Sequence, residues 1–323
     1  MCEIMHPLLI RLLPSWPAMH GKPEKLIVEL TNHCNLKCKM CGIWAEPRKK
    51  IFPLDLFSRI LQDPAMKHLR HIALTGGEPF LLPNLEEYYA VARKHAPQAH
   101  ISISTNGYLT ERTMRFLREA NQRLLSVFIS YDGMKSHDTI RGVEGSARRL
   151  LETAQAIRKE CPRMALGLKL TITPYNAGEI LDTAKQCKSL GIPFRIKTME
   201  KIKCHQNRYP SEISEPDYSD EMVDSIITQA REMLLMGIGT NTSYIRKLIR
   251  KYEGRTVKCT CSPAQLFIGV DGDVYLCRRK DSIGNVLRQH ISEIWDSSGK
   301  EKVVGQMKTC EEWRGRSLSY IYE

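Results

Sequence analysis

The stretch KLIVELTNHCNLKCKMCGIW, residues 25–44, joins an apolar run of strand character to three closely spaced cysteines. Cys34, Cys38 and Cys41 are separated by three residues and then by two. A structural zinc site usually takes four protein ligands, whereas three thiolates on one loop suit a 4Fe–4S cluster with one open iron. We therefore expect a cluster that a small molecule can chelate, with a structural zinc knuckle as the alternative.

Outward from this stretch, short apolar runs alternate with amphipathic segments of helical spacing. The runs predict strands at 25–30, 71–76, 100–105, 126–131, 166–173 and 194–199. The helical segments between them are 53–63, 84–96, 110–121, 144–160 and 178–190. This alternation predicts an α/β fold with a parallel sheet whose strands are covered on both faces. Such a repeat forms a full or partial β/α barrel or a doubly wound sheet.

Polar motifs follow the first four predicted strands at the points where they end. They are TNHC, GGEP, TNG and YDG, in chain order. Because ligands of parallel α/β folds gather at the carboxyl ends of the strands, these motifs predict the edge of the sheet at which chemistry takes place.

The rest of the chain divides by composition. Residues 1–24 form an arm broken by prolines, which we expect to pack on the barrel and which lacks a signal or membrane-spanning core. Residues 25–204 form the barrel, and 205–255 form a polar linker with helices at about 216–236 and 241–252. Residues 256–323 form a small cysteine-rich C-terminal extension, with a hairpin turning at Asp271 and Gly272.

Charge and composition indicate which classes of function suit this chain. The formal net charge of +12 favours acidic partners, but the basic residues are scattered and aromatic residues make up only 7%. A non-catalytic, metal-dependent nucleic-acid-binding protein is therefore a remote alternative. Eleven cysteines without a signal peptide indicate a cytoplasmic protein that uses thiols as metal ligands.

The cysteine spacing together with GGEP resembles the signature of the radical S-adenosylmethionine (radical SAM) superfamily. The resemblance implies a partial (β/α)6 TIM-like barrel and a 4Fe–4S cluster held by Cys34, Cys38 and Cys41. It also implies that S-adenosylmethionine binds the open iron and is reductively cleaved to a 5′-deoxyadenosyl radical, which abstracts a hydrogen atom from substrate. An electron donor such as flavodoxin or ferredoxin is implied as a partner.

The same resemblance suggests which residues contact the cofactor. Ser130 and Arg141, from SYDG and HDTIRG, are candidates for the methionyl carboxylate and ribose, with Asp132 as a supporting or turn residue. Glu78 has the alternative role of a capping carboxylate. The full set of predicted cofactor-binding residues is Met40, Gly76, Gly77, Glu78, Pro79, Ser104, Asn106, Ser130 and Arg141.

The cysteines of the tail resemble the SPASM extension, or its shortened form, twitch. Their number implies one auxiliary 4Fe–4S cluster, with the ligands Cys259, Cys261, Cys277 and Cys310. Cys204 is a reserve ligand, because Cys259 and Cys261 are unusually close in sequence. Cys161 and Cys187 lie in helical patterns and are expected in the core.

SYDG and HDTIRG, joined to this tail, resemble peptide- and protein-modifying radical SAM enzymes. We therefore expect a maturase that acts on a peptide substrate. The alternative is an oxidoreductase of a small molecule such as a sugar, nucleotide, lipid or cofactor precursor. Candidates for a general acid or base are Glu200, His205 and Tyr209, and none is assigned.

Overall fold

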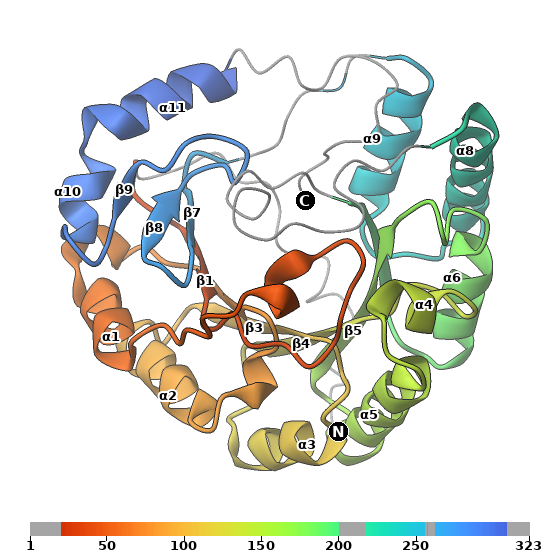
Figure 1. Cartoon of the computed structure of the whole chain (residues 1–323), viewed down its shortest axis with the longest axis horizontal. Helices are drawn as coiled ribbons and strands as arrows, with labels where there is room; N and C mark the ends of the chain where they lie inside the picture. Colours follow the sequence, from red (N-terminus) through yellow and green to blue (C-terminus); the bar gives the residue numbers. More distant parts are fainter. Residues whose placement is uncertain (1–20, 200–217, 256, 258–261, 309–323) are drawn as a thin grey trace, which may run out of the picture.

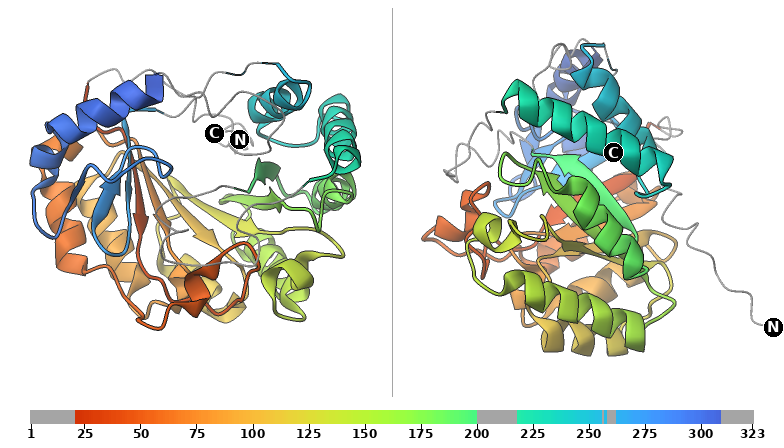
Figure 2. Two further views of the ribbon diagram at one scale, coloured as in Figure 1. Left: turned by 45° about the horizontal axis from the view of Figure 1, so that its top comes forward. Right: turned by 90° about the vertical axis from the view of Figure 1, so that its right-hand side faces the viewer.

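The computed structural model describes residues 21–199, 218–255, 257 and 262–308. Six parallel strands follow one another in chain order and form most of one sheet. They are β1 (Lys25–Glu29), β2 (His71–Thr75), β3 (His100–Thr105), β4 (Leu125–Ser130), β5 (Ala165–Ile172) and β6 (Phe194–Thr198). The sheet curves around a centre but does not close, because β6 lies at one edge (Figures 1 and 2).

Helices connect these strands and cover the outside of the curved sheet (Figure 1). The longer ones are α1 (Leu54–Gln62), α2 (Leu85–His95), α3 (Thr110–Glu119), α5 (Ser146–Glu160) and α6 (Ile180–Ser189). Three short 3-10 helices, η2 (Gly42–Ala45), η3 (Pro64–Met66) and η4 (Pro79–Leu81), and the short helix α4 (His137–Arg141) lie in the connections.

The C-terminal part adds helices and continues the sheet. Helices α8 (Asp220–Leu235) and α9 (Thr242–Tyr252) lie beside β6, whose Thr198 backbone N–H donates to the Tyr244 hydroxyl. Strands β7 (Gln265–Ile268), β8 (Asp273–Tyr275) and β9 (Gly284–Asn285) follow, and then helices α10 (Ile291–Trp295) and α11 (Ser298–Lys308). Strand β7 pairs in parallel with β1, so the tail extends the barrel sheet to nine strands.

The two faces of the sheet differ in character. Alternate residues such as Leu26, Val127 and Leu168 are fully buried in one apolar core with the helices. The intervening residues, such as Phe128 and Lys169, face the inside of the curve and are only half-buried. Other inner-face residues, such as His71, Ser102 and Ser126, are buried, so this face is covered less evenly than the outer one.

The six predicted barrel strands and all seven predicted helices are present, with ends shifted by a few residues. The hairpin at Asp271 and Gly272 is confirmed by the antiparallel β7–β8 pair, and Gly272 has φ +81°. The parallel β1–β7 pair was not predicted, because no local sequence pattern indicates which distant segments pair. No described helix is long and apolar enough to cross a membrane.

Candidate functional site

The three cysteines of the opening stretch lie on the loop that follows β1. Cys38 is buried, and Cys34 and Cys41 are half-buried. The Cys41 backbone N–H donates to the Cys38 carbonyl at 3.1 Å, and the Trp44 indole N–H donates to the same oxygen at 3.3 Å. The chain therefore turns tightly between the second and third cysteines.

Helix α4 holds this loop from the side. The backbone N–H groups of Lys37 and Lys39 donate to the carbonyls of Arg141 and Ile140, at 3.0 and 2.9 Å. Gly142, which ends α4, has φ +68°, and a Cβ atom there would lie 2.4 Å from the Lys37 carbonyl oxygen. Glycine is thus required where the end of α4 meets the cysteine loop.

The GGEP segment lies against the other side of the cysteine loop. The Gly77 N–H donates to the Thr31 carbonyl at 2.6 Å, and the Glu78 N–H donates to the His33 carbonyl at 2.7 Å. A Cβ atom at Gly77 would lie 2.1 Å from the His33 carbonyl oxygen and 3.0 Å from Cys34 Cβ. Two adjacent glycines therefore allow the β2 loop to approach the cysteines as closely as it does.

The Glu78 side chain is fully buried and connects two predicted motifs. One carboxylate oxygen accepts from the Phe80 N–H at 3.1 Å and the Thr105 hydroxyl at 2.8 Å. The other accepts from the Asn106 N–H at 2.7 Å. Burial raises the pKa of Glu78 to about 7, although these three hydrogen bonds oppose the shift. Glu78 therefore caps the first turn of η4 through its hydrogen bond from Phe80, as the alternative role predicted. The same side chain also binds Thr105 and Asn106 at the end of β3.

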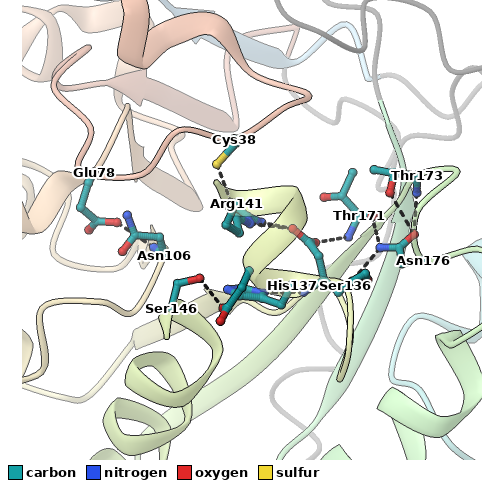
Figure 3. A network of polar contacts seen from close by, with 12 residues as sticks. Cys38, Glu78, Asn106, Ser136, His137, Arg141, Ser146, Thr171, Thr173 and Asn176 are labelled. Carbon is teal, nitrogen blue, oxygen red and sulfur yellow. Dashed lines mark hydrogen bonds and ion pairs between the residues drawn. The ribbon is translucent and has the colours of Figure 1, made fainter. Parts of the chain in front are cut away.

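Asn106, which lies beside Glu78 in Figure 3, also contacts the cysteine loop. Its side-chain N–H donates to the side-chain oxygen Oδ1 of Asn35 at 2.8 Å. Asn35 directly follows Cys34, so the ends of β1, β2 and β3 are joined through side chains. No role was predicted for Asn35, because its partner Asn106 is distant along the chain.

Asp132 is the centre of a second buried network, which connects β4, β5 and α4. Its carboxylate accepts from Arg141 Nε at 2.6 Å and from the Thr171 N–H at 2.8 Å. The Asn176 amide donates to the Asp132 carbonyl at 2.8 Å, and the Asp132 N–H donates to His137 Nδ1 at 3.0 Å. This network was missed from the sequence, except for the supporting role suggested for Asp132.

Arg141 reaches from this network to a predicted cluster ligand (Figure 3). Its terminal nitrogen donates to the Cys38 sulfur at 3.6 Å. Burial raises the pKa of the Cys38 thiol, and the positive charge of Arg141 opposes that shift. The Arg141 guanidinium thus contacts both Asp132 and Cys38.

The remaining predicted cofactor-binding residues lie at the carboxyl ends of the parallel strands or on the loops that follow them. Ser104 and Ser130 are half-buried on the inner face at the ends of β3 and β4. Met40 is half-buried beside Cys41, and Pro79 is buried in the first turn of η4. The structure therefore brings the predicted cofactor residues of the first cluster to one edge of the sheet.

The predicted auxiliary ligands are mostly outside the described residues. Cys259, Cys261, Cys310 and the reserve Cys204 lie there, as do Glu200, His205 and Tyr209. Cys277 is described and is buried after β8. Cys161 and Cys187 are buried in the core, as expected.

The first three cysteines fit an iron–sulfur cluster better than a single metal ion. Within the described ranges, no three His, Cys, Asp or Glu side chains converge to hold one ion. Burial is the main cause that raises the pKa of Cys34 to about 12, and the nearby Cys38 and Cys41 sulfurs act in the same direction. Neighbouring thiols on one loop suit a cubane, in which each thiolate binds a different iron. Gly76 and Gly77 of GGEP lie beside this loop and are half-buried.

Comparison with known proteins matches this geometry. Residues 28–187 match the radical SAM superfamily model, and residues 259–314 match the SPASM model, an iron–sulfur cluster-binding domain. The chain is 25% identical over 295 residues to the sporulation killing factor maturation protein SkfB of Bacillus subtilis, covering 90% of this chain and 68% of SkfB. It is 24% identical over 321 residues to the AdoMet-dependent heme synthase of Methanosarcina barkeri, covering 93% and 88%.

A solved structure supports the fold. SuiB of Streptococcus suis bound to S-adenosylmethionine has a TM-score of 0.65 at 14% identity, covering 88% of this chain and 68% of SuiB. The cofactors of the two matched domains are a 4Fe–4S cluster with S-adenosylmethionine, and auxiliary iron–sulfur clusters in the tail. When bound, the first cluster supplies the electron that reductively cleaves S-adenosylmethionine. The chain belongs to the radical SAM superfamily of enzymes and carries a C-terminal SPASM domain.

Proposed function

We propose that this enzyme is a maturase that modifies a ribosomally made peptide or protein. The observation that carries the proposal is the match to SkfB, a maturation protein, over 90% of this chain. The match therefore extends beyond the motifs that radical SAM enzymes share. The inner face of the sheet carries half-buried side chains at the ends of β3 and β4, Ser104 and Ser130, beside which a peptide segment can lie.

In this proposal, the chain's own residues position the cofactor and the peptide. Cys34, Cys38 and Cys41 hold the first cluster, and the GGEP backbone receives S-adenosylmethionine. Ser104 and Ser130 lie on the inner face at the same edge, where their hydroxyls can hydrogen-bond the cofactor. Auxiliary ligands are proposed as Cys259, Cys261, Cys277 and Cys310.

A direct test is modification of candidate peptides. The cluster-loaded enzyme is incubated anaerobically with S-adenosylmethionine, a reductant and peptides encoded by neighbouring genes. We expect 5′-deoxyadenosine together with a mass change in one peptide, and neither product with Cys38→Ala. Formation of 5′-deoxyadenosine without modification of any peptide encoded nearby would contradict the maturase assignment.

The second candidate is a small-molecule enzyme. It is favoured by the heme synthase match, which covers 88% of that relative's length. Under either assignment we propose flavodoxin or ferredoxin as electron donor. We also propose the cytoplasm as the location, because thiol ligands persist in a reducing compartment.

A further inference from the structure

The segment that holds the three predicted cluster ligands is basic. Residues 34–51 contain one acidic residue, Glu46, and five basic residues: Lys37, Lys39, Arg48, Lys49 and Lys50. Five minus one gives this segment a formal charge of +4, a third of the +12 of the whole chain. Positive charge is therefore concentrated beside the first cluster, while the other basic residues are scattered along the chain.

Two of these lysines are close to Cys38. Lys37 directly precedes Cys38, and its backbone N–H donates to the end of α4. The Lys49 Nζ atom donates to the Trp44 carbonyl at 2.8 Å, and the Trp44 indole in turn donates to the Cys38 carbonyl. The other two cysteines of the loop are only half-buried. A protein that contacts these lysines would therefore lie close to the cluster ligands.

The side chains of Lys37, Arg48 and Lys49 are exposed, and together they define the cysteine-loop surface. Next to it, the Lys39 Nζ atom lies 5.4 Å from the centre of the Tyr175 ring, and Tyr175 is 49% exposed. Tyrosine is enriched in protein–protein interfaces, whose rims are polar. The surface thus combines exposed positive charge with an exposed aromatic ring.

The acidic residues near this surface offset only part of its charge. Glu46 is half-buried, and its carboxylate accepts from the Arg48 backbone N–H at 3.1 Å. Asp271, from the C-terminal hairpin, forms an ion pair with Lys50. Glu144, which follows α4, is exposed. The four other basic residues of the segment outnumber Glu46 and Glu144, so a net positive charge remains.

We propose that the cysteine-loop surface, with Tyr175 beside it, docks an acidic electron-transfer protein that reduces the first cluster. The inference rests on the proposed electron donor and is independent of whether the substrate is a peptide. In each docking event the donor loses one electron and the cluster gains it.

Charge complementarity favours this partner because it speeds the encounter of two proteins, and contacts between electron-transfer proteins are small and weak. Docking here places the donor against the segment that carries the cluster ligands. An acidic peptide substrate, in contrast, would have to reach the inner face of the sheet.

The test compares a protein donor with a small one. Formation of 5′-deoxyadenosine is measured on the cluster-loaded full chain with S-adenosylmethionine and either pre-reduced flavodoxin of acidic isoelectric point or saturating dithionite. Dithionite is small and needs no docking surface. We expect Lys37→Glu and Arg48→Glu to raise the flavodoxin concentration for half-maximal rate about five-fold or more. The dithionite-driven rate should stay unchanged, because neither variant removes a cluster ligand.

Salt and a control variant separate docking from other effects. The difference from wild type should shrink between about 20 mM and about 0.5 M salt, because salt screens exposed charges. Lys159→Glu is the matched control and should use flavodoxin as the wild type does. Lys159 is exposed in the last turn of α5, which precedes β5 and so lies at the opposite ends of the strands. Iron content and melting temperature are measured for each variant, and Arg48→Glu decides the outcome if Lys37→Glu does not load.

The proposal is overturned if flavodoxin does not drive the wild type, if the loaded variants use it as the wild type does, or if Lys159→Glu weakens its use equally. A loss that dithionite shares also overturns it, because the substitutions would then act on the cluster and not on docking. Flavodoxin dependence as predicted, with no peptide modified under either reductant, contradicts only the maturase assignment.

Discussion

The guanidinium of Arg141 lies between the carboxylate of Asp132, 2.6 Å away, and the sulfur of Cys38, 3.6 Å away. The ion pair orients the guanidinium, and the guanidinium in turn presents an N–H to a cluster ligand. Reduction adds negative charge to an iron–sulfur cluster, and hydrogen bonds to its sulfurs are one determinant of its reduction potential. A donor that stabilises this charge favours the reduced state.

We expect Arg141→Met to shift the reduction potential of the first cluster to a more negative value. The cause is the loss of both the positive charge and the N–H donor at Cys38. The shift is measured by a potentiometric titration followed by electron paramagnetic resonance of the loaded enzyme. Slower cleavage of S-adenosylmethionine should accompany it.

A second variant separates this effect from loss of stability. Arg141→Met alone leaves the buried Asp132 carboxylate without its cation, at a cost of about 3–5 kcal/mol. The double variant Asp132→Asn, Arg141→Met should recover part of that stability while keeping the negative shift. The exposed Arg118 on α3 provides a control through Arg118→Met, which should not change the potential. Equal potentials in all variants would exclude this role of Arg141.

Removal of single cysteines should separate the clusters by iron content. Two 4Fe–4S clusters give about eight irons per chain. We expect Cys38→Ala to lose about four of these irons and to abolish 5′-deoxyadenosine formation, because a thiolate ligand is missing. Cys277→Ala should lose the auxiliary irons and retain the first cluster. The core variant Cys187→Ala is the control and should keep its full iron content; loss of iron there would show that the assay reports unfolding instead.

The parts of the fold that the sequence predicts best are those with local signals. The barrel strands have short apolar runs, and the helices have 3.6-residue periodicity. The motifs fall at strand ends, so the cysteine loop, GGEP and TNG were all predicted to lie at one edge of the sheet. The β1–β7 pair joins Lys25 to Gln265 and was not predicted, since register between distant strands depends on the folded surface.

The site was predicted less completely than the fold. Sequence resemblance identified Arg141 and Asp132, but not that they pair with each other or that Arg141 contacts Cys38. His137 was part of a quoted motif without a role, although its ring accepts a hydrogen bond from the Asp132 backbone.

The close approach of GGEP to the cysteine loop predicts a strong effect of Gly77→Ala. The added Cβ atom would lie 2.1 Å from the His33 carbonyl oxygen, and neither backbone segment can move without breaking hydrogen bonds. We expect a loss of more than about 2 kcal/mol in the free energy of unfolding. Weaker binding of S-adenosylmethionine, measured by calorimetry on the loaded enzyme, should accompany it.

Gly178→Ala is the control for this substitution. A Cβ atom at Gly178 has no heavy atom within 4 Å, apart from its chain neighbours, so alanine is tolerated there. The Gly178 variant should bind S-adenosylmethionine as the wild type does. Normal binding by Gly77→Ala would mean that the loop adjusts and that the glycine is not needed for the cradle.

The buried imidazole of His137 predicts a loss of stability in acid. Burial, followed by the charge of Arg141, lowers its pKa to about 4 from an ordinary value of 6.5. The folded chain therefore keeps this ring neutral, while the unfolded chain binds a proton below pH 6.5. The free energy of unfolding is therefore unaffected by this group above pH 6.5 and decreases as the pH falls toward 4. At pH 5 the expected decrease is about 2 kcal/mol.

His137→Asn tests this pH dependence, because the Asn side-chain oxygen can still accept from the Asp132 N–H. Urea unfolding between pH 7 and pH 5 should show a smaller loss of stability for the variant than for the wild type. Taking the difference at each pH cancels contributions common to both proteins, including those of the clusters. His100, whose pKa burial also lowers to about 4, gives a matched variant in His100→Asn. The two effects should add in the double variant; a wild-type slope in His137→Asn would mean that this ring is protonated in the folded chain.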